Sequence, residues 1–132
     1  MIKVKVFTPN GAYKEIETPI LNIGSVDGER GLLPNHMNTI FALAISKMET
    51  EENGVRHYYA ISGGMLYFKD NVANIFVNAI ESKEEIDLER AQKAKVKAEE
   101  SIRRKNPDID LMVAELALRR ALNRIKIYNY PD

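Results

Sequence analysis

The sequence VANIFVNAIESKEEIDLERAQKAKVKAEESIRR, residues 72–104, contains the point at which the spacing of apolar residues changes. Before Lys83, apolar residues occur in short runs or at every second position, which is typical of β-strands. After Lys83 they recur every three or four positions and so line one side of a helix: Leu88, Ala91, Ala94, Ala98 and Ile102. The pattern predicts a chain with strands first and helices second.

The residues before Lys83 are predicted to form several short strands. Ile2, Val4 and Val6 alternate with Lys3 and Lys5, which places apolar side chains on one face. Further apolar runs cover residues 16–23, 39–45, 55–62, 65–68 and 72–79, and turn-forming residues such as Glu52-Asn53-Gly54 and Lys69-Asp70-Asn71 separate them. Regular short strands of this kind favour a sandwich or a barrel.

Two helices are expected after the strands. The first, about 18 residues and roughly 27 Å long, should end near Arg103-Arg104-Lys105, and Asn106-Pro107-Asp108 supplies a breaker and a new N-cap. The second has a wider apolar surface: Ile109, Met112, Val113, Leu116, Ala117, Ala121, Leu122 and Ile125. The two helices can close as an antiparallel hairpin. An alanine-rich seam buries little apolar area, so the hairpin is expected either to open or to remain a static pair of surface helices.

Composition excludes several classes of protein. The 132 residues contain 19 basic and 19 acidic side chains, so net charge gives no overall attraction to nucleic acid or anionic lipid. There are no cysteines, which excludes disulfides and thiolate metal sites. The longest apolar run, residues 40–45, is far shorter than the roughly 20 residues that span a bilayer, so any membrane association is expected to be indirect.

Signatures of catalysis are also missing from the sequence. There is no G-x-x-x-x-G-K-[ST] phosphate loop and no G-x-S-x-G nucleophile elbow. His36 and His57 are the only histidines, and their spacing matches no zinc motif. We therefore expect no catalytic residues, no metal site and no required cofactor.

Four sequence blocks occur in order along the chain: GSVDGERGLLPNH at 24–36, ISGGMLYF at 61–68, DNV and the following apolar residues at 70–79, and IDLERA at 86–91. In this order they resemble the epsilon-subunit family of F-type ATP synthases. The first block has Asn35 where the family has glycine, and Met37-Asn38 follow where Ala-Pro is usual. Asparagine tolerates a left-handed backbone, so the same turn is expected.

The resemblance implies an α+β fold, with an N-terminal antiparallel β-sandwich over residues 1–84 and a C-terminal two-helix hairpin over residues 85–132. It also implies a non-catalytic rotor subunit that helps couple ion translocation to ATP synthesis at the cytoplasmic face of the bacterial plasma membrane. The sandwich would contact the gamma subunit and the membrane c-ring. Glu29 stands where the family has a ring-contacting acidic residue, and His36 where it has a residue near the shaft. The alternative for both is an ordinary loop side chain.

The same resemblance makes the hairpin a regulatory element that inhibits ATP hydrolysis when it extends into the alpha/beta catalytic head. Some bacterial members bind ATP on the closed hairpin as a regulatory ligand. The corresponding residues here are Glu81, Ile86, Asp87, Arg90, Arg120 and Arg124, with Lys97 where a further arginine can occur. The alternative is that Asp87 caps the first helix and the arginines are structural or contact the head.

The sequence leaves two alternative functions. Residues 93–105 carry six basic and two acidic side chains, so the first helix could be the basic arm of a stand-alone nucleic-acid or protein binding module. Aromatic residues that would stack on single strands are missing there, so no nucleic-acid partner is expected. The third hypothesis, a small enzyme, lacks any recognisable catalytic group.

Overall fold

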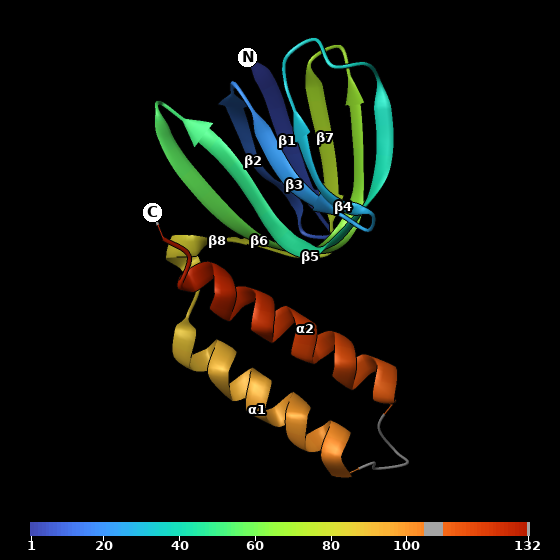
Figure 1. Ribbon diagram of the computed structural model, residues 1–132, viewed down its shortest axis with the longest axis vertical. Helices are drawn as coiled ribbons and strands as arrows, with labels where there is room; N and C mark the ends of the chain where they lie inside the picture. The colour runs from blue at the N-terminus through green and yellow to red at the C-terminus, as the bar shows by residue number, and fades with distance from the viewer. Residues whose placement is uncertain (105–109, 132) are drawn as a thin grey trace.

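The computed structural model describes residues 1–104 and 110–131, which form a β-sandwich with two helices beneath it (Figure 1). The predicted α+β fold class is confirmed. The strands are β1 (Ile2–Thr8), β2 (Gly11–Thr18), β3 (Leu21–Ser25), β4 (Gly28–Leu32), β5 (Thr39–Glu52), β6 (Val55–Lys69), β7 (Val72–Val77) and β8 (Ile80–Ser82). A short 3₁₀ helix η1 (Lys83–Glu85) leads to α1 (Leu88–Arg104) and α2 (Leu111–Tyr128).

The strands are hydrogen-bonded in the order β2-β1-β7-β6-β5-β3-β4, and β8 pairs with β6. All pairs are antiparallel except β1 and β7, which run parallel. The core lies between the facing halves of this folded sheet, and the alternation in the first strand predicts its inward residues correctly. Ile2, Val4 and Val6 are fully buried.

Two predicted strand boundaries are wrong, for identifiable reasons. The apolar run 16–23 is split between β2 and β3, because Pro19 has no N–H to donate to a ladder. Residues 55–62 and 65–68 belong to one strand, β6, in which Gly63 and Gly64 make a bend instead of a turn. Both glycines have positive φ, +79° and +148°. The glycine pair therefore does change the backbone direction, as the sequence indicated, but it bends the strand and does not end it.

Strand β6 lies between two apolar clusters. Tyr59 and Ile61 face the interior of the sandwich. Their neighbours Tyr58 and Ala60 face the helices and form a second cluster with Ile86 and Ile127, against which Tyr130 packs. This second cluster is the apolar contact between the sandwich and the hairpin.

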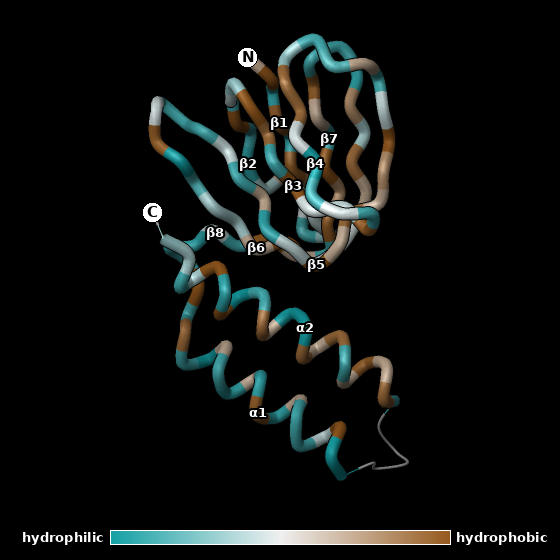
Figure 2. The backbone as a smooth tube through the Cα atoms, viewed as in Figure 1, coloured by the Kyte–Doolittle hydropathy of each residue, from teal (hydrophilic) through white to brown (hydrophobic). Residues whose placement is uncertain are grey.

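The two helices differ in what they contact. Helix α2 lies between α1 and the sandwich (Figure 1), and α1 packs chiefly on α2. The buried residues of the seam are small, Ala91 and Ala98 in α1 with Ala114 and Ala121 in α2. In Figure 2, α1 is mostly hydrophilic while α2 carries more hydrophobic residues. Part of the apolar surface predicted for α2 remains in solvent, since Met112, Val113 and Leu122 are exposed.

Side chains cap the start of each helix. The carboxylate of Asp87 accepts a hydrogen bond from the backbone N–H of Arg90 at 3.1 Å, and Asp110 accepts one from Met112 at 2.9 Å. The predicted breaker Asn106-Pro107-Asp108, and also Lys105 and Ile109, lie outside the described residues. Within residues 1–104 and 110–131, neither helix is apolar enough over its length to cross a bilayer.

Candidate functional site

A cavity of about 410 Å³ lies between the hairpin and the sandwich. Small and apolar side chains of both layers form much of its wall, among them Ala60, Ala79, Ile80, Ala94, Ala117 and Ala121. Its charged side chains are Glu81 from β8, Arg90 from α1, and Arg120 and Arg124 from α2. The structure therefore brings together four of the six residues predicted from the sequence. The volume of the cavity falls within the roughly 300–1,000 Å³ usual for small-molecule sites.

The arginines surround the cavity because of helix geometry. Arg120 and Arg124 are one turn apart on α2, and Arg90 reaches the same space from the first turn of α1. Arg124 forms a bidentate ion pair with Glu81 through Nε and Nη2, and both side chains are about a quarter exposed (25% and 27%). Among the residues that the structure describes, Arg90 and Arg120 form no ion pair, so the cavity carries more positive than negative charge.

This arrangement suits an anion with several oxygens. A guanidinium is a planar fork that binds phosphate bidentately, and it remains charged at any physiological pH. Three such groups on two helices repel one another, and an anion bound between them would relieve the repulsion. The apolar part of the wall offers a surface for a flat or aliphatic group beside the charged part.

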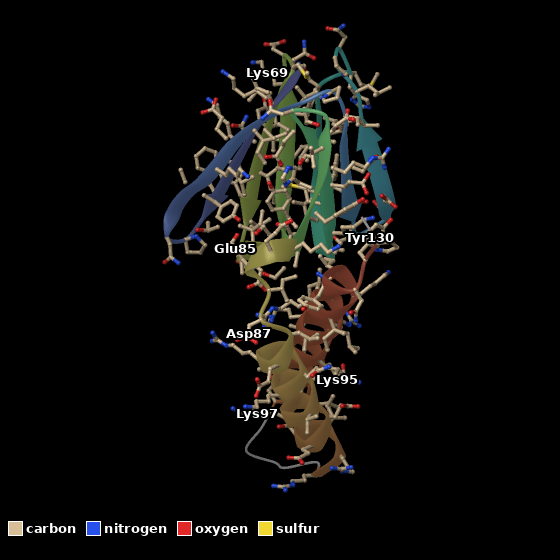
Figure 3. All side chains as sticks on the ribbon, turned by 90° about the vertical axis from the view of Figure 1, so that its left-hand side faces the viewer. Lys69, Glu85, Asp87, Lys95, Lys97 and Tyr130 are labelled. Carbon is tan, nitrogen blue, oxygen red and sulfur yellow. The ribbon has the colours of Figure 1, made fainter. Side chains whose placement is uncertain are left out.

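The other two predicted residues are elsewhere. Ile86 is only 5% exposed and belongs to the second cluster with Tyr58 and Ile127. Asp87 caps α1 and does not line the cavity (Figure 3 labels it at the start of that helix). Lys97 also lies outside the cavity wall and is exposed.

Glu29 and His36, the predicted rotor contacts, are both exposed but lie at different ends of the sandwich. Glu29 borders a second hollow, about 390 Å³, together with Lys126 and Tyr130 near the helices. His36 follows Asn35, whose backbone N–H donates to Asn71 and whose side-chain oxygen accepts from it, just after the Lys69 end of β6. Figure 3 shows Lys69 and Tyr130 well separated along the molecule.

The left-handed turn predicted at Asn35 is confirmed by its φ of 67°. Its N–H donates to the side-chain oxygen of Asn71 at 2.5 Å, and the Asn71 amide donates back at 3.2 Å. The ring of His36 lies edge-on to Phe68 with 5.9 Å between centroids, and its Nδ1 is 2.7 Å from the carbonyl oxygen of Met37. The loop thus holds His36 in a defined position.

A polar network that joins the sandwich to the start of the hairpin was not predicted. The hydroxyl of Tyr13 donates to Glu85 at 2.5 Å, and Ser82 and Glu85 form a capping box around η1. These hydrogen bonds, first that of Tyr13 and then those of Ser82, lower the pKa of the Glu85 carboxyl. The S-x-x-E spacing was visible in the sequence, but the pairing with Tyr13 spans 72 positions and leaves no local signal.

An exposed apolar patch on the outer face of the sheet was also missed. Phe7 and Phe76 stack with 5.3 Å between ring centroids, and Met65 pairs with Phe76 across β6 and β7. Phe76 is 51% exposed, and Met65, Tyr67 and Ile40 are also exposed. The alternation of side chains along the strands could have predicted the patch, because these residues alternate with the inward-facing ones and so point to the outer face.

The described residues contain no group of three or more side chains that could hold a metal ion.

Comparisons with known proteins agree over nearly the whole chain. The family model for the ATP synthase delta/epsilon chain β-sandwich domain matches residues 1–83, and that for the delta/epsilon long α-helix domain matches residues 84–129. The chain is similar to the ATP synthase epsilon chain of Bacillus licheniformis, with 35% identity over 126 residues, covering 96% of each. It is 38% identical over 136 residues to that of Lactobacillus helveticus, covering 98% of this chain and 93% of the relative.

Solved structures give the same fold. A chain in the cryo-EM structure of the Euglena gracilis mitochondrial ATP synthase, which contains OSCP, F1 and the c-ring, superposes with a TM-score of 0.80 at 26% identity. The match covers 92% of this chain and 78% of that one. A chain of the central stalk and c-ring of the Tetrahymena thermophila enzyme matches with a TM-score of 0.61 at 13% identity, which supports the fold alone.

Proposed function

Because the chain belongs to the delta/epsilon family of ATP synthase subunits, we propose that it is a rotor subunit whose hairpin is regulated by ATP bound in the cavity beside β8. The subunit itself is a non-catalytic part of the central stalk of an F-type ATP synthase. This assignment replaces the stand-alone nucleic-acid module as the reading of the basic helix α1. Its Lys93 forms a surface ion pair with Glu89 at 3.1 Å.

The convergence of three guanidiniums on one partly apolar cavity is the observation that carries the nucleotide proposal. Arg90 belongs to α1, whereas Arg120 and Arg124 belong to α2, so a triphosphate between them would link the helices. A ligand that binds only the closed hairpin shifts the population toward it. ATP would thereby disfavour the extended, inhibitory hairpin, and falling ATP would release it.

The Glu81–Arg124 ion pair has a consequence for this binding. Arg124 pairs with the Glu81 carboxylate in this structure, so a phosphate group that binds Arg124 must displace Glu81. Glu81 would then be free to accept a hydrogen bond from the adenine amino group, the role proposed for it. Asp87 is assigned an indirect role, because it caps the helix that carries Arg90.

Calorimetric titration of the full chain with ATP, ADP and magnesium tests the proposal. Arg124→Ala should weaken ATP binding about 10- to 100-fold, since a hydrogen bond to a charged group contributes roughly 1.5–3 kcal/mol. Arg104→Ala is the matched control, because Arg104 is exposed at the end of α1 and lines none of the cavities discussed above. No saturable binding at millimolar ATP, or equal losses in both variants, would eliminate nucleotide regulation and leave the rotor role.

We further propose that the sandwich docks on the gamma subunit, which forms the central shaft, through the exposed patch around Phe76 and through His36. Glu29 would contact the c-ring. Docking would hold the subunit peripherally at the cytoplasmic face of the membrane. Phe76→Asp should reduce its retention by the purified gamma subunit. Val55→Asp is the control and should leave retention unchanged. Val55 is also exposed (58%), but it is the first residue of β6, far along the strand from Met65, which pairs with Phe76. Equal retention of the two variants would place gamma elsewhere.

The hairpin is proposed to inhibit hydrolysis by contact with the alpha/beta head, and the division into a docking part (1–84) and a regulatory part (85–132) follows from these roles. Removing residues 85–132 should raise ATP hydrolysis by the assembled complex and leave assembly intact. Unchanged hydrolysis would refute an inhibitory hairpin.

A further inference from the structure

The hairpin is attached to the sandwich mainly through the C-terminal end of α2. The side-chain amide of Asn123 donates to the carbonyl oxygen of Ser46 at 2.9 Å, and Ile127 is 1% exposed within the second cluster. Tyr130 follows at the same helical spacing of three to four residues and packs on that cluster. At the other end of α2, Leu111 to Val113 are exposed and touch no buried cluster.

Tyr130 has contacts on three sides. The ammonium of Lys47, from β5, lies 3.8 Å from the centroid of its ring. The ring of Tyr58, from β6, lies 4.8 Å away at 51°. The ammonium of Lys83, from η1, donates to the carbonyl oxygen of Tyr130 at 2.5 Å. A single side chain, two residues beyond the end of α2, therefore contacts two strands, and its backbone contacts the start of the hairpin.

We propose that Tyr130 is a latch that holds the hairpin closed against the sandwich in the absence of nucleotide. Its functional importance depends on the regulatory role proposed for the hairpin, but its existence does not depend on ATP binding. The latch sets the closed-to-open ratio that any ligand of the hairpin then shifts.

Few other contacts join the hairpin to the sandwich beside Tyr130, chiefly those of Asn123, Arg124 and Ile127, and all of them lie near the same end of α2. The seam between α1 and α2 is built from alanines, and α1 makes little contact with the sandwich. By contrast, a cation over an aromatic ring and a close aromatic pair are each favourable, and at Tyr130 they occur together. Burial alone would lower the pKa of Lys47, but its contacts with Tyr130 and Glu49 raise it, so the ammonium remains charged at neutral pH.

Strand β6 provides a direct assay of opening. Ala60, 7% exposed, faces the hairpin, whereas the next residue, Ile61, 1% exposed, faces the interior of the sandwich. The chain has no cysteine, so Ala60→Cys would carry the sole thiol and react with a disulfide reagent when the hairpin opens. The thiol of Ile61→Cys would react only when the sandwich unfolds.

In the full chain without nucleotide, Tyr130→Ala should accelerate modification of the Ala60→Cys thiol roughly 10- to 100-fold, as expected for the loss of a partly buried cation–π contact and an aromatic pair. Tyr130→Phe should retain most of the protection, because the ring makes these contacts. Tyr128→Ala is the matched control, a tyrosine two residues away that is 42% exposed. It should change the rate less than about 3-fold, as is usual for a surface substitution.

The same variants in the Ile61→Cys background separate opening from unfolding. The latch requires that Tyr130→Ala leave this second rate unchanged. An unchanged Ala60→Cys rate, or equal acceleration in both backgrounds, would overturn the proposal, the first because Tyr130 holds nothing and the second because it supports the whole fold. Neither result would bear on nucleotide binding, which the titration measures separately.

Discussion

Replacing Gly64 with alanine should destabilise the protein far more than replacing its neighbour Gly63. A Cβ on Gly64 would lie 1.9 Å from the carbonyl oxygen of Phe76, on the adjacent strand β7, whereas one on Gly63 would lie 3.6 Å from that of Leu43. Real Cβ atoms keep at least 3.0 Å from such neighbours, so β7 would have to move by at least 3.0 − 1.9 = 1.1 Å. A displacement of that size breaks ladder hydrogen bonds, whose usual N···O distance is about 2.9 Å.

The magnitudes follow from these geometries. Gly63→Ala should lower the free energy of unfolding by about 1–2 kcal/mol, because its only cost is the strain of an alanine at φ +79°. Gly64→Ala combines backbone strain with overlap against a packed strand, each about 1–3 kcal/mol, for a total of about 4 kcal/mol. Because domains of this kind are stable by only about 5–15 kcal/mol, the second variant should lose a large share of its stability.

Urea denaturation followed by far-ultraviolet circular dichroism measures the difference. With a slope of about 1–3 kcal/mol per molar urea, the midpoint of Gly64→Ala should lie at least about 1 M below that of Gly63→Ala. Midpoints that coincide would mean that β6 and β7 are not in such close contact at this bend, and the physical account of the paired glycines would be wrong.

Three other predictions concern the junction with the hairpin. Glu85→Gln should destabilise the protein at neutral pH but not in acid. The folded-state pKa of this carboxyl is lowered, so its contribution is complete above its ordinary pKa of 4.5 and is lost as pH falls through the lower value; pH-dependent melting of this variant and of Tyr13→Phe would show it. Ile127→Ala should cost about 2–5 kcal/mol of hairpin attachment and raise thiol reactivity in the Ala60→Cys background. Asp87→Ala should lower the helicity of α1 by removing a cap of about 1 kcal/mol, detectable by circular dichroism.

Features that depend on neighbouring residues were predictable from the sequence. Alternation identified the inward face of β1, and the change of period after Lys83 separated strands from helices. The turn at Asn35 followed from the tolerance of asparagine for a left-handed backbone, and the φ of 67° agrees.

Features that depend on tertiary pairing were not predictable from the sequence. The parallel pairing of β1 with β7 and the ion pair between Glu81 and Arg124 join residues far apart in sequence. The four charged residues of the cavity came from resemblance to the family, because three arginines on two helices have no spacing that indicates a shared cavity. Tyr130 lies beyond the end of α2, and its contacts with Lys47 and Tyr58 join residues far apart in sequence, so no local pattern predicted them.

The attachment of α2 at one end has a mechanical consequence. A helix of 18 residues is about 27 Å long, and its firm contacts are at Asn123, Ile127 and beyond. A force applied near Leu111, perpendicular to the helix, would therefore break these contacts one after another, as in peeling. A force along the helix axis would load all of them at the same time, as in shear. Peeling requires much less force than shear for the same contacts, so the hairpin should separate from the sandwich most easily when it is pulled at the Leu111 end of α2.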